Sequence, residues 1–165
     1  MLDQLIFTDE AAIAGVPVPF LTINTVGPTI MRYGTPEQKA FYLPRIAAGE
    51  LHFSIGYSEP EARHRPGRAA HPAVRDGDEY VIDGQKMWTS LIQYADYVWL
   101  ACRTDPDAPS GTEGLSIIIV PTSAAGLLLD AGADGRGRDD QRDLLLRRCG
   151  CLPRRWSARR TGAGR

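Results

Sequence analysis

Two stretches of sequence decide the fold, Leu51-His52-Phe53-Ser54-Ile55-Gly56-Tyr57-Ser58-Glu59-Pro60-Glu61-Ala62 and Tyr80-Val81-Ile82-Asp83-Gly84-Gln85-Lys86-Met87-Trp88-Thr89-Ser90. The first alternates between apolar and polar side chains as far as Tyr57, which is typical of a half-buried strand. In the second, Asp83-Gly84 separates two short apolar runs, and a two-residue Asp-Gly linker favours a β-hairpin. Both stretches therefore predict β-structure, with a hairpin turn at Asp83-Gly84.

Two more strands are expected after this hairpin. Residues 97–102 and 115–120 are short apolar runs, and Pro121 closes the second of them. The segment 105–111 between them is rich in Asp, Pro, Ser and Gly, as loops are. Several short strands joined by such turns predict a small antiparallel β-sandwich or barrel-like domain.

The first 50 residues predict helices instead. Thr35 is a suitable N-cap, Pro36 suits the first helical position, and Gln38 completes a capping box. An earlier helix is expected over residues 21–32, ending at Gly34. The fold class is therefore α+β, with an N-terminal helical segment followed by the antiparallel β-domain.

The C-terminal part differs in composition from the rest. Residues 1–130 hold 9 Lys or Arg and 16 Asp or Glu, a net charge of −7, whereas residues 131–165 hold 10 Arg and 4 Asp, a net charge of +6. No apolar periodicity continues beyond Leu129, so residues 127–165 are expected to form a disordered or irregular tail. A basic arm for nucleic acid is the alternative. We do not expect it, because the tail has no Lys, Phe or Tyr to combine charge with base stacking.

Several other classes of protein are also disfavoured. The chain of 165 residues, 43% hydrophobic, suits one domain, or one domain plus a fragment. It has no apolar run of about 18 residues, so we expect no membrane span. Met1 is followed by acidic and polar residues, so no secretory signal is expected. The odd count of three cysteines favours free thiols and a cytoplasmic location. The three histidines lack metal-ligand spacing, so no metal site is expected.

The ordered motifs resemble those of the acyl-CoA dehydrogenase family. In that family a helical N-terminal domain precedes a β middle domain and a C-terminal four-helix bundle, and FAD lies between the last two. The resemblance covers the chain as far as Gly126. It rests on the following segments: Tyr33-Gly34-Thr35-Pro36-Glu37-Gln38-Lys39, Ser58-Glu59-Pro60 and Asp78-Glu79-Tyr80-Val81-Ile82-Asp83-Gly84-Gln85-Lys86-Met87-Trp88.

The resemblance implies which residues contact the flavin. Tyr57 and Ser58 would supply backbone and hydroxyl contacts to the ring, Trp88 would pack beside it, and Ser90 would donate near N5. Thr89 is a candidate substitute for Ser90, because this chain has Trp-Thr-Ser where many relatives have Trp-Ile-Thr. Without the resemblance, the residues themselves favour a plainer interpretation, in which Trp88 belongs to the core and Ser58 only ends a strand.

One loop departs from the family. Relatives continue Ser-Glu-Pro-x-Ala with Gly-Ser/Thr-Asp, small residues that let the backbone approach phosphates. Here Arg63-His64-Arg65 follow Ala62. Codons can be chosen for Arg63 to His71 so that the next reading frame gives Gly-Thr-Asp-Leu-Ala-Ala-Leu-Arg. Residues 127–145 and, in the remaining frame, residues 149–165 permit a similar recovery of family-like sequence. A local frame slip in the gene is our hypothesis. It would be abandoned if the nucleotide sequence offered no single-base offset that restores these motifs.

These observations predict three segments. They are the end of the dehydrogenase-like helical domain at 1–50, the β middle domain at 51–126 with an altered loop at 63–72, and the tail at 127–165, with the helical bundle missing. Because the family's carboxylate base comes from that bundle, no catalytic residue is assigned, and Glu59 is expected to be a structural or pocket-edge residue. The chain is expected to bind FAD weakly and not to turn over acyl-CoA alone. The alternative is a non-catalytic module that pairs with an intact dehydrogenase subunit.

Overall fold

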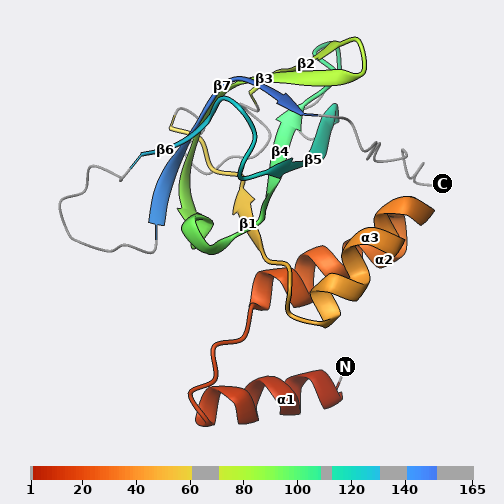
Figure 1. Ribbon diagram of the computed structural model, residues 1–165, viewed down its shortest axis with the longest axis vertical. Helices are drawn as coiled ribbons and strands as arrows, with labels where there is room; N and C mark the ends of the chain where they lie inside the picture. The colour runs from red at the N-terminus through yellow and green to blue at the C-terminus, as the bar shows by residue number, and fades with distance from the viewer. Residues whose placement is uncertain (1, 61–70, 109–112, 131–140, 152–165) are drawn as a thin grey trace.

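The computed structural model describes residues 2–60, 71–108, 113–130 and 141–151. Helices come first and strands follow, as the sequence predicts (Figure 1). The helical elements are α1 (Leu2–Ile13), the π-helix η1 (Thr22–Val26), α2 (Gly27–Tyr33), α3 (Pro36–Ala47) and the later 3₁₀ turn η2 (Ile92–Tyr94). The strands are β1 (Phe53–Gly56), β2 (Ala73–Asp76), β3 (Glu79–Ser90), β4 (Tyr97–Arg103), β5 (Leu115–Pro121), β6 (Leu127–Asp130) and β7 (Gln141–Cys151).

The start of α3 is the capping box that the sequence predicts. The Thr35 hydroxyl accepts a hydrogen bond from the backbone N–H of Gln38, and the Gln38 side chain accepts one from the backbone N–H of Thr35. Two N–H groups that a helix start leaves without partners are satisfied in this way. The preceding helix α2 ends at Tyr33, immediately before Gly34, which confirms the other helix boundary.

The strands form two sheets that pack face to face. One has the order β1-β4-β5 and the other β2-β3-β7-β6. All pairs but one are antiparallel; β1 runs parallel to β4, with Phe53 opposite Tyr97. The α+β fold with a small β-sandwich is thus as predicted, and the expected antiparallel pairing fails only between β1 and β4. Between β1 and β4 the chain passes through β2 and β3 in the other sheet, a crossover long enough for β4 to return in the same direction as β1.

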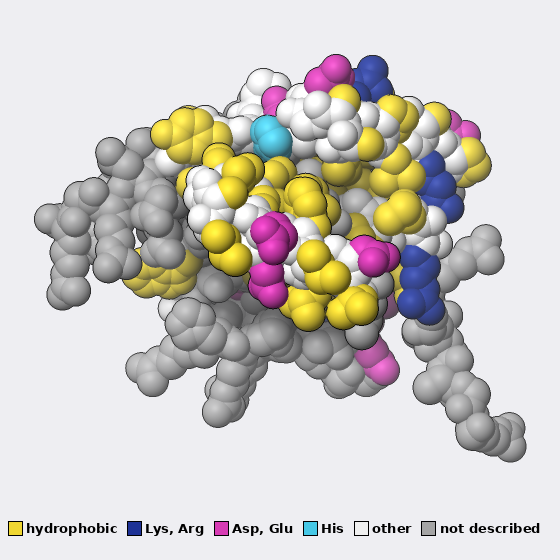
Figure 2. Space-filling view, turned by 90° about the horizontal axis from the view of Figure 1, so that it is seen from below, with side chains coloured by type: hydrophobic (Ala, Val, Ile, Leu, Met, Phe, Trp, Pro, Cys, Tyr) yellow, Lys and Arg dark blue, Asp and Glu magenta, His cyan; other side chains and the backbone are white. Residues whose placement is uncertain are grey.

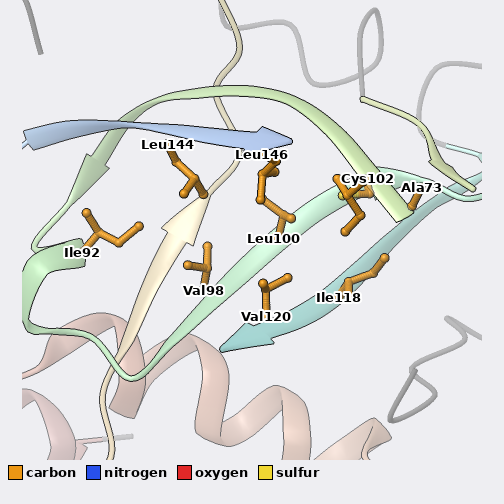
Figure 3. Packing of buried hydrophobic residues seen from close by; sticks show 10 residues of the cluster. Ala73, Ile92, Val98, Leu100, Cys102, Ile118, Val120, Leu144 and Leu146 are labelled. Carbon is orange, nitrogen blue, oxygen red and sulfur yellow. The ribbon is translucent and has the colours of Figure 1, made fainter. Parts of the chain in front are cut away.

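The core lies between the two sheets (Figure 3). Along β4, Val98, Leu100 and Cys102 point into it, because alternate residues of a strand share one face. Trp99, on the opposite face of β4, packs among residues of the helical segment. The β1-β4-β5 sheet is thus covered on both faces, by the second sheet and by helices. The helix-facing cluster comprises Val26, Ile30, Tyr42, Leu51, Phe53 and Trp99.

The hairpin turn is not at Asp83-Gly84. Strand β3 runs without a break from Glu79 to Ser90, and the two-residue turn is Gly77-Asp78, which joins β2 to β3 with Asp76 opposite Glu79. Gly77 adopts a φ of 59°, a conformation that glycine tolerates in tight turns. At Gly84 the pairing of β3 with β7 shifts register instead. Residues 71–90 contain two Asp-Gly pairs, Asp76-Gly77 and Asp83-Gly84, and the turn forms at the first of them.

The segment expected to be an irregular tail contains two strands. Strand β6 pairs with β7, and β7 pairs with β3, so β7 is a central strand of its sheet. Leu144 and Leu146 bury their side chains in the core between the sheets. Strand β7 also contains Asp143 and Gly150, residues of low strand propensity, so the sequence pattern did not indicate a strand here. Residues 131–140 and 152–165 lie outside the described residues, as does most of the altered loop at 63–72.

Helix α1 lies below α2 and α3 in Figure 1, and the Gln4 side chain donates a hydrogen bond to the Asn24 side chain of η1. Ala11 is its buried residue, and its larger apolar side chains are exposed. Figure 2 looks onto this side of the molecule and shows groups of hydrophobic side chains with acidic ones between them. Within the described ranges, no helix has the length and apolar character that a bilayer crossing requires. The exposed apolar residues of α1 are Leu2, Leu5, Ile6, Phe7 and Ile13.

Candidate functional site

The two stretches that decide the fold lie side by side in the structure. The Ser58 carbonyl accepts a hydrogen bond from the backbone N–H of Met87 at 2.8 Å. Four residues earlier in the first stretch, the Ser54 hydroxyl donates a hydrogen bond to the backbone carbonyl of Ser90 at 2.6 Å. These two bonds tie β1 and the loop that follows it to the second half of β3. The predicted site residues of the two stretches are therefore neighbours in space.

Tyr57 forms one side of this site. Its ring is 42% exposed, and its hydroxyl oxygen accepts a hydrogen bond from the Trp99 indole N–H at 3.1 Å. Partial burial raises the pKa of the Tyr57 hydroxyl above its usual value, and the bond from Trp99 opposes that shift. The side chain is therefore neutral around pH 7. Trp99 itself is held in the core, so it fixes the outer end of the Tyr57 ring.

Trp88 lies on a strained and bulged part of β3. Its φ is 58°, and the pairing of β3 with β7 shifts register between Lys86 and Thr89. A left-handed conformation at a bulky residue costs on the order of 1–3 kcal/mol, and such strain clusters at ligand sites. The Trp88 side chain is 45% exposed. Trp88 is therefore not a core residue, which contradicts the part of the plainer interpretation that concerns Trp88.

The two hydroxyl residues after Trp88 differ in exposure. Thr89 is completely buried, and its hydroxyl has no hydrogen-bond partner among the described residues. Ser90 is exposed, while its carbonyl is bonded to Ser54. Ser58 is partly exposed. Of the two alternatives left open by the sequence, Ser90 is thus the one whose hydroxyl an external ligand can reach.

A buried ion pair lies behind this surface. Lys86 Nζ is 2.5 Å from Glu59 Oε1, and the two residues are 1% and 3% exposed. The family resemblance implies that Glu59 is a structural or pocket-edge residue, and nothing in the sequence indicates a role for Lys86. The available signal was the two-residue alternation of a strand, which places Lys86 on the same face as the apolar Ile82.

The geometry suits a flat, partly apolar ligand. Two half-exposed aromatic side chains, Tyr57 and Trp88, belong to the same two neighbouring stretches as the accessible Ser58 and Ser90. An isoalloxazine ring needs an apolar or aromatic wall and polar groups at its edge. These residues fit that requirement. In the described part of the chain, no group of three or more His, Cys, Asp or Glu side chains is placed to hold a metal ion.

Comparison with known proteins identifies the two halves of the chain. Residues 1–50 match the N-terminal domain of acyl-CoA dehydrogenase, and residues 54–149 match its middle domain. The second match continues past Gly126, where we expected the resemblance to end. The chain is 69% identical to acyl-CoA dehydrogenase FadE26 of Mycobacterium tuberculosis over 127 residues, which make up 76% of this chain and 32% of that protein.

Solved structures agree with this identification. The ChsE4-ChsE5 complex from Mycobacterium tuberculosis is 58% identical with a TM-score of 0.83, covering 92% of this chain and 39% of that one. A glutaryl-CoA dehydrogenase from Mycobacterium smegmatis in complex with FADH2 is 29% identical with a TM-score of 0.64, covering 77% of this chain and 32% of that one. The chain thus spans about a third of the length of the relatives it matches.

Proposed function

This chain belongs to the acyl-CoA dehydrogenase family, and from that premise we propose that Tyr57, Ser58, Trp88 and Ser90 form a wall for the isoalloxazine ring of FAD. The observation that carries the proposal is the position of Trp88. It is held at a positive φ in a bulge and exposed beside the loop that contains Ser58. A large apolar ring placed in this way has no role in the core.

Each wall residue has a role in this proposal. Trp88 supplies the apolar surface against which the ring packs, and Ser58 and Ser90 supply hydroxyls at its polar edge. Tyr57 is fixed by Trp99 and limits access of water from its side. Thr89, being buried, is not assigned a contact. When bound, the flavin would accept the hydride that leaves the β-carbon of an acyl-CoA thioester, which is the substrate class we propose.

The residues present do not supply every part of that reaction. We assign no catalytic base, and Glu59 is unsuited to that role because its carboxylate is buried against Lys86. A cofactor site encloses about 70–90% of its ligand. These 165 residues correspond to about a third of their relatives. We therefore propose that this polypeptide alone binds FAD weakly and does not oxidise acyl-CoA.

Titration of the purified chain with FAD tests the wall. Replacement Trp88→Gly removes the ring and suits the positive φ, so it should leave folding intact. We expect it to weaken FAD binding at least tenfold, measured by flavin fluorescence. The control is Tyr94→Gly, which removes another exposed aromatic residue, in η2. Equal FAD affinity in the wild type and Trp88→Gly would refute the assignment of Trp88.

A second function is favoured by the surface of α1. We propose that this chain pairs with another dehydrogenase subunit through the exposed apolar residues of α1, because groups of such residues on a surface mark interaction sites. A related structure is a complex of two components, ChsE4 and ChsE5. Co-expression with an intact relative tests this, with Phe7→Ser as the variant expected to weaken the complex. Aggregation of the chain with no stable complex would count against pairing.

A further inference from the structure

The Glu59–Lys86 ion pair joins four segments of the chain at one point. Lys86 Nζ donates to Glu59 Oε1 at 2.5 Å and to the Ala101 carbonyl of β4 at 2.7 Å. Glu59 Oε1 also accepts the backbone N–H of His71, just before β2, at 2.9 Å. The loop after β1, the start of β2, strand β3 and strand β4 are thus connected through two side chains.

The pair also lies next to both halves of the proposed flavin wall. Glu59 directly follows Ser58, and Lys86 precedes Trp88 by two residues. Between them, the backbone bond from Met87 to Ser58 joins the two segments. Any movement of Glu59 relative to Lys86 would therefore move Ser58 relative to Trp88.

Stability alone does not account for this pair. Removing two charges from water costs several kcal/mol per ion, and replacing a buried pair by apolar side chains is often neutral or stabilising. A strained residue, in contrast, persists only where its surroundings fix it. Trp88 is such a residue. On its C-terminal side it is held by the pairing of Thr89 and Ser90 with β7 and by the Ser54 bond. On its N-terminal side it is held by the backbone bond of Met87 to Ser58 and, one residue earlier, by the ion pair of Lys86 with Glu59.

We propose that the Glu59–Lys86 pair is a positioning device that holds the Trp88 bulge in its outward conformation and sets its place beside Ser58. This inference depends on the proposed function at one point, which is that the positioned surface is a wall for the flavin. Glu59 and Lys86 contact no ligand themselves. Without the pair, the Trp88 side chain would exchange between several positions while the sheets remain paired.

Fluorine NMR of the full chain labelled with 5-fluorotryptophan tests this directly. The chain has Trp88, Trp99 and Trp156, and Trp88→Phe assigns the first signal. The double variant Glu59→Gln/Lys86→Met removes both charges and keeps similar side-chain sizes. We expect the Trp88 signal to shift and to broaden or split, while the Trp99 signal and the midpoint of urea unfolding change little. Glu79→Gln, an exposed carboxylate on the same strand, is the control and should change no tryptophan signal.

The outcomes separate positioning from a general structural role. An unchanged Trp88 signal in the double variant would overturn the proposal, as would equal disturbance of the Trp88 and Trp99 signals. If the double variant does not fold, Glu59→Gln alone is judged by the same criteria, because it removes one charge of the ion pair and keeps the side-chain size. FAD affinity should fall about tenfold in the double variant. If the wild type binds no FAD, the proposed function fails, while the NMR comparison still decides the positioning role.

Discussion

Helices α1 and α3 have the same length but differ in how far their apolar side chains are buried against the rest of the molecule. Each spans 12 residues. Helix α3 starts with a complete capping box, and its Tyr42 is buried against Phe53 and Tyr97 of the β-domain. In α1, Leu2, Leu5 and Ile6 follow the spacing of an amphipathic helix, yet all three are exposed. An apolar stripe therefore predicts that a helix has a partner surface, but it does not say that the surface lies within the same 165 residues.

The largest expected effect comes from truncating a side chain in the core between the two sheets, to which α1 contributes no described residue. Leu100 is completely buried between the two sheets. We expect Leu100→Ala to lower the free energy of unfolding by about 2–5 kcal/mol, through lost burial and the cavity left behind. Urea unfolding followed by circular dichroism measures it. Leu128→Ala, the same change at an exposed position of β6, should have a much smaller effect. Equal losses at the two sites would contradict the described core.

A smaller effect is expected at the start of α3. Thr35→Ala removes the hydroxyl that accepts from Gln38, and we expect a loss of about 1 kcal/mol in the free energy of unfolding. The matched change in α1 is Thr8→Ala. There the hydroxyl donates to the Gln4 carbonyl inside the helix, and alanine is the better helix former. Urea unfolding should thus show no loss for Thr8→Ala; a loss equal to that of Thr35→Ala would mean that α1 also supports the folded core.

The smallest effect is expected on α1 itself. Leu5 is 58% exposed, so we expect Leu5→Ala to change the free energy of unfolding by about 0.5 kcal/mol or less. Urea unfolding at two protein concentrations measures this change and its dependence on association. A loss above about 1 kcal/mol that grows with concentration would show that a second copy covers α1 in solution.

The fold was predictable where local chemistry decides it. The Thr35 capping box, the end of α2 before Gly34 and the strands β4 and β5 all follow from short-range patterns, and the structure confirms them. The hairpin was misplaced because Asp76-Gly77 and Asp83-Gly84 are locally similar, and only pairing with β7 decides between a turn and a bulge. Strand β7 was missed because its burial depends on partners distant in sequence.

The candidate site was predictable in part. The resemblance pointed to Tyr57, Ser58, Trp88 and Ser90, and the structure brings the two stretches that hold them together. Sequence could not choose between Thr89 and Ser90, because the bulge at Trp88 determines which of them turns inward. It also could not reveal that Lys86 is bonded to Glu59, since that contact depends on the packing of one sheet against the other.

The central place of β7 bears on how the chain folds during synthesis. The last residue of β3, Ser90, pairs with Gln141, and Tyr80 near its start pairs with Cys151. Strand β3 therefore leaves the ribosome well before its neighbour exists. During that interval one edge of the sheet stays open, and pairings between distant segments form slowly. Nascent chains that stop before residue 141 would carry an unpaired strand edge, which is a site for aggregation.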